Sequence, residues 1–173
     1  MSPVEMPIQQ QRPACVRRLA ERLRLTTAQA DDVAEQIRLL AKDRYEPLTR
    51  LCGVNLLTAG TVAGLLGPGR RFESEAQLAA YAGTSPLEAS SSGLTRHRLN
   101  RGGNIRLNSV IYRIALTQAH FHPDAKAYLK RRVSEGKTRR EAHRCLRRYI
   151  ARAIWRLWQE CMRQQTAKIV EAA

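Results

Sequence analysis

The strongest constraint on the fold of this chain is a long amphipathic pattern near its C-terminus. From Thr138 to Met162, apolar residues recur at intervals of three and four, which is the period of an α-helix with one buried face. The segment Thr138-Arg-Arg-Glu141 has the spacing of a capping box and predicts a helix over 139–162. The apolar positions are Ala142, Cys145, Leu146, Tyr149, Ile150, Ala153, Ile154, Leu157, Trp158 and Cys161.

Arginines recur at every fourth residue on the other side of the same predicted helix. Guanidinium groups at that interval form a row spaced by about 6 Å, comparable with the spacing of phosphates along a nucleic-acid strand. A solvated face is the alternative interpretation, but only Glu141 stands near the row, so a nucleic-acid contact is favoured. The arginines of this row are Arg140, Arg144, Arg148, Arg152 and Arg156.

The net charge of +15 is concentrated in the C-terminal part of the chain. Residues 1–93 hold 11 Lys and Arg against 10 Asp and Glu, whereas residues 94–173 hold 19 against 5. Such a gradient indicates a polyanionic partner, with DNA or RNA foremost. A membrane surface is the alternative, because basic amphipathic helices also bind anionic lipid. It is disfavoured because the aromatic residues are few and the apolar faces resemble a protein core.

Other sequence features predict a cytoplasmic protein that does not enter a membrane. There is no signal peptide and no apolar run of membrane-spanning length. The four cysteines form no C-x-x-C pair and suggest no disulfide framework. His120-x-His122 has no evident third ligand, so no metal site is predicted.

The remaining pattern predicts an all-α, mainly helical fold. Residues 1–13 read as a disordered tail and 163–173 as a frayed tail. Residues 14–45 read as a helical linker or arm of two helices, the second opened by the capping-box spacing Thr26-Thr-Ala-Gln29. Its apolar stripe could pair with another helix, which predicts a homo-oligomer through the arm. Further helices are expected at 74–83, 104–119 and 124–133, with a serine- and arginine-rich loop or short hairpin over 84–100.

Residues 46–66 resemble a helix-hairpin-helix, with Gly53-Val-Asn55 as the turn. Such a turn offers backbone N–H groups to a phosphate at a helix N-terminus. The usual Pro-Gly-Ile-Gly is replaced here by Cys52-Gly-Val-Asn55, but asparagine tolerates a left-handed backbone. Gly53 and Asn55 are therefore candidate phosphate contacts, with a plain helical corner as the equally weighted alternative.

The segment Ser90-Ser-Ser-Gly93 precedes a dense group of arginines, and no Asp or Glu occurs between Ala89 and Pro123. Arginine forks match phosphate oxygens in pairs, and a serine among them is a candidate nucleophile on phosphorus. His97 is the titratable base of this segment near neutral pH. The candidate phosphate contacts are Arg96, Arg98, Arg101, Asn104 and Arg106.

These motifs together resemble the C-terminal, serine-bearing domain of DEDD-type insertion-sequence transposases, the IS116/IS110/IS902 family. The resemblance covers about residues 45–160, and residues 46–162 are expected to form that domain. The runs that carry it are 72–83, Pro86, 89–93, 96–104, 127–132, 135–141 and 144–149. It implies a role in DNA transposition, with DNA and a guide (bridge) RNA as partners. It also implies that Ser92, directly before the glycine, attacks a DNA phosphodiester, with Ser90 and Ser91 as the alternatives.

The family's other domain is RuvC-like and binds Mg²⁺ through four acidic residues. Asp31, Asp32, Glu35 and Asp43 fall on one predicted helix rather than on separate strands, so that domain is expected to be missing from this chain. No cofactor is therefore expected on this chain, and Mg²⁺ is expected only with the RuvC-like domain. The alternative function is a catalytically inactive fragment that still binds DNA or RNA.

Overall fold

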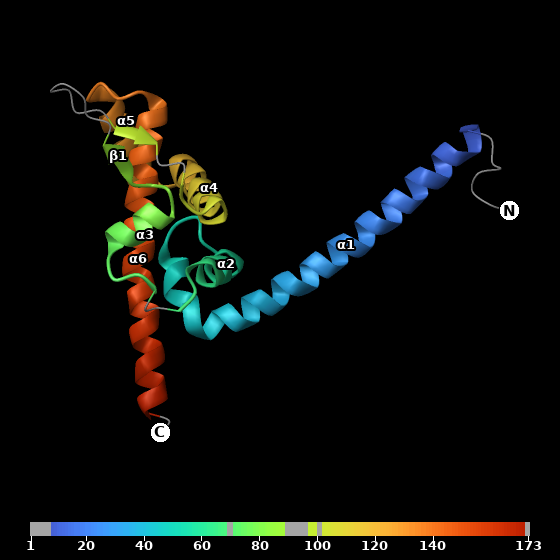
Figure 1. The fold of residues 1–173 in the computed structure, drawn as a ribbon, viewed down its shortest axis with the longest axis horizontal. Coiled ribbons are helices and arrows are strands. Elements are labelled where there is room, and N and C mark those ends of the chain that lie inside the picture. Colours follow the sequence, from blue (N-terminus) through green and yellow to red (C-terminus); the bar gives the residue numbers. More distant parts are fainter. Residues whose placement is uncertain (1–7, 69–70, 89–96, 100–101, 172–173) are drawn as a thin grey trace.

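The computed structural model describes residues 8–68, 71–88, 97–99 and 102–171. Helices dominate this part of the chain, and one short antiparallel pair of strands accompanies them. The prediction of an all-α fold is therefore confirmed. Figure 1 shows the long helix α6 (Arg139–Glu171) running through the whole height of the body, while α1 (Ile8–Tyr45) projects away from it.

Helix α6 begins as its sequence predicts and ends later than predicted. Glu141 accepts hydrogen bonds from the backbone N–H of Thr138 at 2.8 Å and from its hydroxyl at 2.7 Å, which confirms the capping box. Residues 163–171, predicted as part of a frayed tail, are helical. Their side chains reach the end of α1, where Gln165 Nε2 donates to the carbonyl of Arg44 at 3.1 Å.

The core forms where the inner side of α6 meets the shorter elements. Leu146, Ile150, Ile154 and Trp158 are all buried in one cluster with residues of those elements. Burying a side chain of this size contributes about 1.5–3 kcal/mol to the free energy of unfolding. The packing against α6 therefore provides much of the stability of the helical body. The shorter elements are the 3₁₀ helix η2 (Glu46–Arg50), α2 (Leu56–Leu66), α3 (Glu75–Tyr81), α4 (Ile105–Phe121) and α5 (Pro123–Ser134).

The N-terminal arm is one continuous helix. The predicted start of a second helix at Thr26 is therefore wrong. The hydroxyl of Thr26 donates to the carbonyl of Arg22 at 2.8 Å, which is the bond of a threonine inside a helix rather than at its start. Residues 8–13, predicted within a disordered tail, are helical and include Pro13. The helix of 38 residues is about 57 Å long at 1.5 Å per residue.

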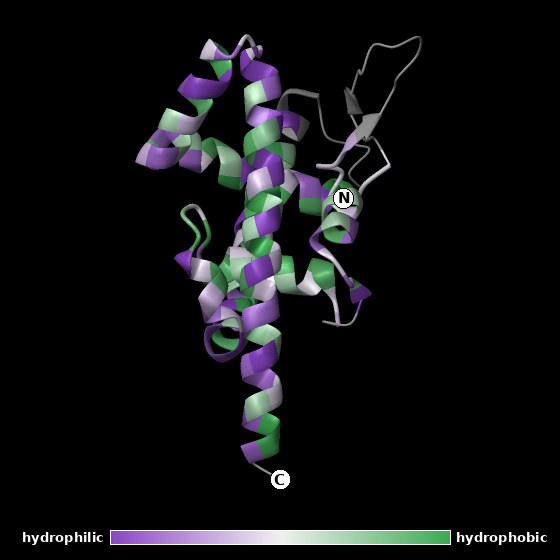
Figure 2. Cartoon of the chain, turned by 90° about the vertical axis from the view of Figure 1, so that its left-hand side faces the viewer, coloured by the Kyte–Doolittle hydropathy of each residue, from purple (hydrophilic) through white to green (hydrophobic). Residues whose placement is uncertain are grey.

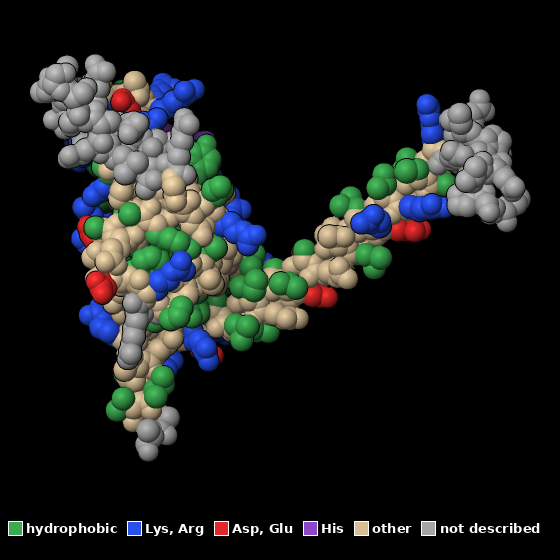
Figure 3. Space-filling view, viewed as in Figure 1, with side chains coloured by type: hydrophobic (Ala, Val, Ile, Leu, Met, Phe, Trp, Pro, Cys, Tyr) green, Lys and Arg blue, Asp and Glu red, His purple; other side chains and the backbone are tan. Residues whose placement is uncertain are grey.

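Only the C-terminal end of α1 is anchored in the body. Ala41 is buried, and the ring of Tyr45 stacks on Trp158 with centroids 5.5 Å apart. Further out, Val16, Leu19 and Leu23 are each at least 60% exposed, and hydrophobic side chains appear along the arm in Figure 3. The arm therefore carries apolar surface that this chain does not bury.

The other predicted elements are found close to their expected bounds. Residues 46–50 form a 3₁₀ helix instead of the predicted α-helix, with Pro47 in its first turn, where the missing N–H has no intrahelical partner to lose. In the segment 84–100, the short hairpin is the alternative that the structure shows: β1 (Pro86–Glu88) pairs with β2 (His97–Leu99), with Glu88 opposite His97.

No helix among the described residues combines the length and the apolar content that crossing a membrane requires.

Candidate nucleic-acid interface

The arginine row of α6 lies on the side of the helix opposite the core. Each arginine precedes by two residues one of the buried positions Ala142, Leu146, Ile150, Ile154 and Trp158. Two residues turn a helix by about 200°, so the two rows face in opposite directions. Arg140, Arg144 and Arg156 are exposed, and Arg148 and Arg152 are half-buried. Figure 2 shows hydrophilic residues recurring along α6.

Acidic groups neutralise this row at one position. Arg152 Nε lies 2.9 Å from a carboxylate oxygen of Glu75 on α3. Arg140, Arg144, Arg148 and Arg156 take part in none of the ion pairs among the described residues. Four of the five guanidinium groups are therefore available to an anion.

Glu141, the acidic residue beside the row, is occupied by the helix terminus. Its hydrogen bonds from Thr138 hold the pKa of its carboxyl below the usual value, and Lys137 and Arg144 add to this effect. The carboxylate accepts from the N–H and the hydroxyl of Thr138, and it lies at the positive end of the helix dipole. Glu141 keeps its charge near Arg144, but it forms no ion pair with any arginine of the row.

Further arginines and tyrosines, which the sequence pattern did not single out, lie between α5 and α6. Tyr149 was predicted on the buried face but is 59% exposed. Its ring centroid is 6.3 Å from that of Tyr128 on α5. The hydroxyl of Tyr128 accepts a hydrogen bond from Arg132 Nε at 3.1 Å, which raises the pKa of that guanidinium together with Glu135. The sequence pattern that could have predicted this cluster is the occurrence of tyrosines next to arginines in 128–132 and 148–149.

The predicted helix-hairpin-helix has its turn packed against α4. Gly53 has a φ of +89°, and a Cβ there would meet Thr117 at 3.1 Å. The carbonyl of Cys52 accepts a hydrogen bond from Gln118 at 3.0 Å. Asn55 caps α2, because its side-chain oxygen accepts from the N–H of Thr58 at 2.8 Å. One N–H that a phosphate could use is thus already bonded, and phosphate binding at Gly53 and Asn55 stays a prediction.

The ends of the serine- and arginine-rich segment are joined at the junction of α3 and α4. A Cβ on Gly103 would overlap the backbone of Gly83. Asn104, predicted to contact nucleic acid, caps α4 by accepting from the N–H of Leu107 at 2.9 Å. Its side-chain nitrogen lies 2.7 Å from the hydroxyl oxygen of Tyr81. Asn104 therefore ties α3 to α4 in the described structure.

The predicted catalytic group falls largely outside the described residues. Ser90, Ser91, Ser92, Arg96 and Arg101 lie in segments 89–96 and 100–101, which the structure does not describe. Arg98 belongs to β2, where the backbone alone is described, and Arg106 is exposed in the first turn of α4. Ser92 thus belongs to the segment that connects the paired strands β1 and β2.

The acidic residues of the arm do not fit a magnesium site. Asp31, Asp32 and Glu35 are exposed on the single helix α1, and Glu35 pairs with Arg38 at 3.1 Å. Within the described ranges, no group of three or more His, Cys, Asp or Glu side chains could hold a metal ion. Carboxylates on one exposed helix do not surround a cation with the near-octahedral oxygen ligands that Mg²⁺ requires.

Comparison with known proteins agrees with the motifs of the central part of the chain. Residues 45–130 match the model of the Transposase IS116/IS110/IS902 family. The match runs from the end of α1 into α5 and does not include α6. The chain is also similar to the "Insertion element IS110 uncharacterized 43.6 kDa protein" of Streptomyces coelicolor, with 34% identity over 97 residues.

The similar region covers 55% of this chain but only 24% of that relative's length. The two matches nevertheless agree on the same group of proteins. Over about half of its length, this chain is therefore similar to proteins of the IS116/IS110/IS902 transposase family.

Proposed function

We propose that this chain acts in DNA transposition as the nucleic-acid-binding part of a transposase. The observation that carries the proposal is the arginine row on the outer side of α6, of which four members have no ion-pair partner among the described residues. Figure 3 shows Lys and Arg side chains along the side of the body where α6 lies. The family match covers residues 45–130, next to α6 in the sequence, and supplies the biological context for the chain.

A row of this kind would bind the sugar–phosphate backbone without reading sequence. Successive arginines four residues apart are separated by about 6 Å along the helix axis, so neighbouring guanidinium groups can meet neighbouring phosphates. Each neutralised phosphate releases condensed counterions, so affinity falls as salt rises. We therefore expect DNA binding with a steep salt dependence.

The test compares two triple variants that remove the same charge. Replacing Arg140, Arg144 and Arg148 by alanine should lower the slope of log K against log salt by about 2–3 for duplex DNA. Replacing the exposed Arg18, Arg22 and Arg24 of the arm is the matched control. Fluorescence anisotropy over a salt series measures both slopes. Equal effects of the two triple variants would show that net charge, rather than the α6 row, determines binding.

The proposed chemistry is attack of a serine hydroxyl on a DNA phosphodiester, with Ser92 as the nucleophile. The serine oxygen would bond to phosphorus while one P–O bond to a deoxyribose breaks, and the departing sugar oxygen would take up the serine's proton. This assignment is supported by the family match, whose span 45–130 includes Ser92. The neighbouring Arg96, Arg98 and Arg101 would stabilise the charge that develops on phosphorus.

The serine proposal is tested by trapping the covalent intermediate. The chain would be mixed with the RuvC-like domain of a related transposase, Mg²⁺, a guide RNA and labelled DNA. A denaturant-resistant protein–DNA adduct should form with the wild type and with Ser91→Ala, and it should be lost in Ser92→Ala. An adduct that survives in Ser92→Ala but disappears in Ser91→Ala would assign the chemistry to the other serine.

The arm is proposed to pair with the arm of a second copy of this chain. Val16, Leu19 and Leu23 continue toward the N-terminus the 3–4 spacing of Ala30, Val33, Ile37 and Leu40, the pattern of a two-stranded coiled coil. Apart from Ile37, which packs against Gly60 of α2, these residues are exposed in the single chain. Association would remove this apolar stripe from water.

Two leucines on the arm provide a matched test of this pairing. Leu23 lies on the stripe and is 69% exposed, whereas Leu25 lies off it and is 65% exposed. Leu23→Lys should convert dimers to monomers in sedimentation equilibrium, and Leu25→Lys should not. A wild-type chain that remains monomeric at the highest concentrations used would contradict the pairing.

A further inference from the structure

Tyr149 stands between two hollows on the surface shared by α5, α6 and η2. The larger hollow, of about 480 Å³, lies toward α5, and Tyr149, Tyr128 and Arg131 are among the residues that line it. The smaller hollow, of about 260 Å³, has Tyr149, Arg50, Arg152 and Arg156 in its wall. We call these two hollows with their tyrosines and arginines the Tyr149 site.

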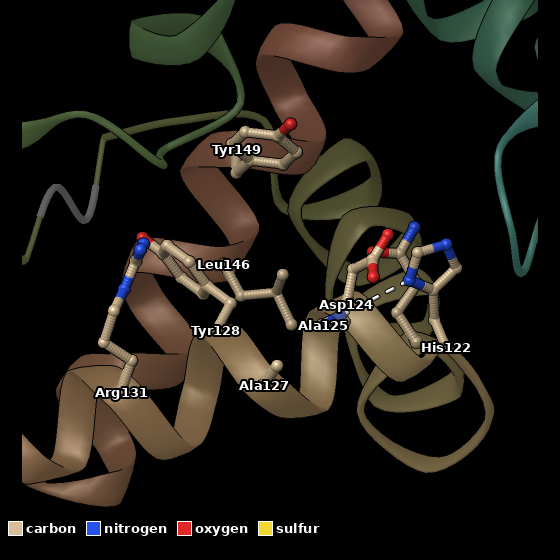
Figure 4. A pocket seen from close by; sticks show the side chains of 9 residues that line it. His122, Asp124, Ala125, Ala127, Tyr128, Arg131, Leu146 and Tyr149 are labelled. Atoms are coloured by element: carbon tan, nitrogen blue, oxygen red, sulfur yellow. Dashed lines mark hydrogen bonds between the residues drawn. The ribbon is translucent and has the colours of Figure 1, made fainter.

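The larger hollow is lined by two tyrosine rings and has the volume to hold a small ring. Figure 4 shows Tyr149 on α6 above Tyr128 and Leu146, while His122 and Asp124 lie at the other side of the pocket. The planes of the two tyrosine rings differ by 34°, so they form a splayed pair rather than a closed stack. Pockets of about 300–1,000 Å³ are the usual size for small organic ligands.

Positive charge borders the larger hollow on the α5 side. Arg131 and Arg132 lie 5.4 Å and 5.2 Å from the centroid of the Tyr128 ring. Glu135 pairs with both, at 3.7 Å and 2.8 Å, and Asp124 is the carboxylate among the residues lining the hollow. The two arginines therefore share one acidic partner.

The smaller hollow contributes the larger part of the uncompensated charge. Arg50 pairs with Glu160 at 2.8 Å and Arg152 with Glu75 at 2.9 Å. Arg156 is exposed and belongs to none of the ion pairs of the described residues. Residues 149, 152 and 156 follow the i, i+3, i+7 spacing, so they share one face of α6.

We propose that the Tyr149 site binds unpaired nucleotides of a single-stranded nucleic acid. A base enters the larger hollow and stacks on Tyr149, and the phosphate that follows it lies against Arg156, which has no acidic partner among the described residues. Aromatic rings beside a basic groove are the combination by which proteins hold single strands, since every base has a face for stacking. This inference rests on the proposed nucleic-acid-binding function and adds the strandedness of the ligand.

A duplex does not satisfy the same site. Its bases are stacked on each other and present only their edges in the grooves, so a ring on the protein surface gains no stacking partner. Duplex DNA would use the arginine row through its phosphates alone. Tyr149 therefore contributes to binding of a single strand but not of a duplex, while the arginine row binds both.

The test measures binding of the full chain to a 12-nucleotide single strand and to a 12-base-pair duplex, at one salt concentration. Tyr149→Ala should weaken binding of the single strand about tenfold or more, because stacking of a base is lost, and leave duplex binding unchanged. Tyr149→Phe retains the ring and should bind as the wild type does. Tyr112→Ala removes a tyrosine that is 46% exposed on α4 and is the matched control.

Two further probes identify what the ring recognises. A single strand with abasic sugars should bind the wild type and Tyr149→Ala equally, because the base is absent. DNA and RNA strands of the same sequence show which of the two the site prefers. Circular dichroism and thermal melting of each variant verify that the fold is retained.

The outcomes separate this inference from the proposed function. Duplex and single-strand binding by the wild type, with no change in Tyr149→Ala, would overturn the Tyr149 site and leave the α6 row intact. An equal loss for duplex and single strand would also overturn it, because the ring would then act on binding in general. Failure of the wild type to bind either ligand would overturn both proposals.

Discussion

Gly83 and Gly103 lie backbone against backbone, so that a side chain on Gly103 would overlap the peptide of Gly83. This contact closes the base of the segment that carries β1 and β2. The adjacent backbone N–H of Asn104 donates to the carbonyl of Tyr81 at 2.6 Å. Two glycines that are distant in the sequence therefore allow the end of α3 and the start of α4 to lie in direct contact.

Gly103→Ala is expected to destabilise the fold by about 1–3 kcal/mol, since an added methyl group here meets backbone that cannot move aside cheaply. Urea denaturation followed by circular dichroism measures the loss. A variant with unchanged stability would show that the junction of α3 and α4 relaxes around the methyl group.

A second prediction compares two glycines on α2 that are four residues apart. A Cβ on Gly60 would overlap the side chain of Ile37 on α1, whereas a Cβ on Gly64 would meet nothing within 4 Å. Gly64→Ala should stabilise the protein by up to about 1 kcal/mol through helix propensity. Gly60→Ala should destabilise it, because the arm is pushed away from α2. Equal effects in thermal melting would refute the close packing of the two helices.

A third prediction concerns the ion pair between Arg152 and Glu75. Both side chains are about two-fifths exposed, so the pair contributes at most about 1 kcal/mol to stability. Glu75→Gln should leave the melting temperature almost unchanged but release Arg152 for a phosphate. The salt slope of DNA binding should then steepen by about 1. A slope that stays the same in Glu75→Gln would place Arg152 outside the interface.

A fourth prediction follows from the lowered pKa of Glu141. A carboxyl whose pKa is lower in the folded than in the unfolded state stabilises the fold above its unfolded pKa, and this contribution is lost as pH falls through the folded pKa. The capping contribution should therefore be full at neutral pH and disappear below the ordinary glutamate range. Carboxyl NMR should show a titration below 4.5, which moves upward in Thr138→Ala. An identical titration in both proteins would remove the hydroxyl of Thr138 as a cause, since Thr138→Ala keeps the backbone N–H donor.

The sequence alone predicted the helices whose capping and periodicity patterns lie within a short stretch of the chain. The capping box at Thr138 and the 3–4 apolar spacing predicted α6, and the helix expected over 74–83 is present with Ser74 as its cap. Caps and periodicity need no distant partner, because backbone hydrogen bonding and the separation of apolar from polar faces act within one helix. The outward direction of the arginine row followed from the same spacing.

Tertiary contacts decided the features that local sequence patterns predicted wrongly or did not specify. The capping-box spacing at Thr26 is an exception, because it misled without any tertiary contact: the hydroxyl of Thr26 bonds the carbonyl of Arg22 inside one continuous helix. Asn104 fits the family motif, yet its side chain bonds Tyr81 from another helix. Tyr149 keeps the apolar period of α6 but is left exposed where α5 and η2 leave the helix uncovered. Burial depends on which neighbour covers a position, and periodicity alone does not specify that neighbour.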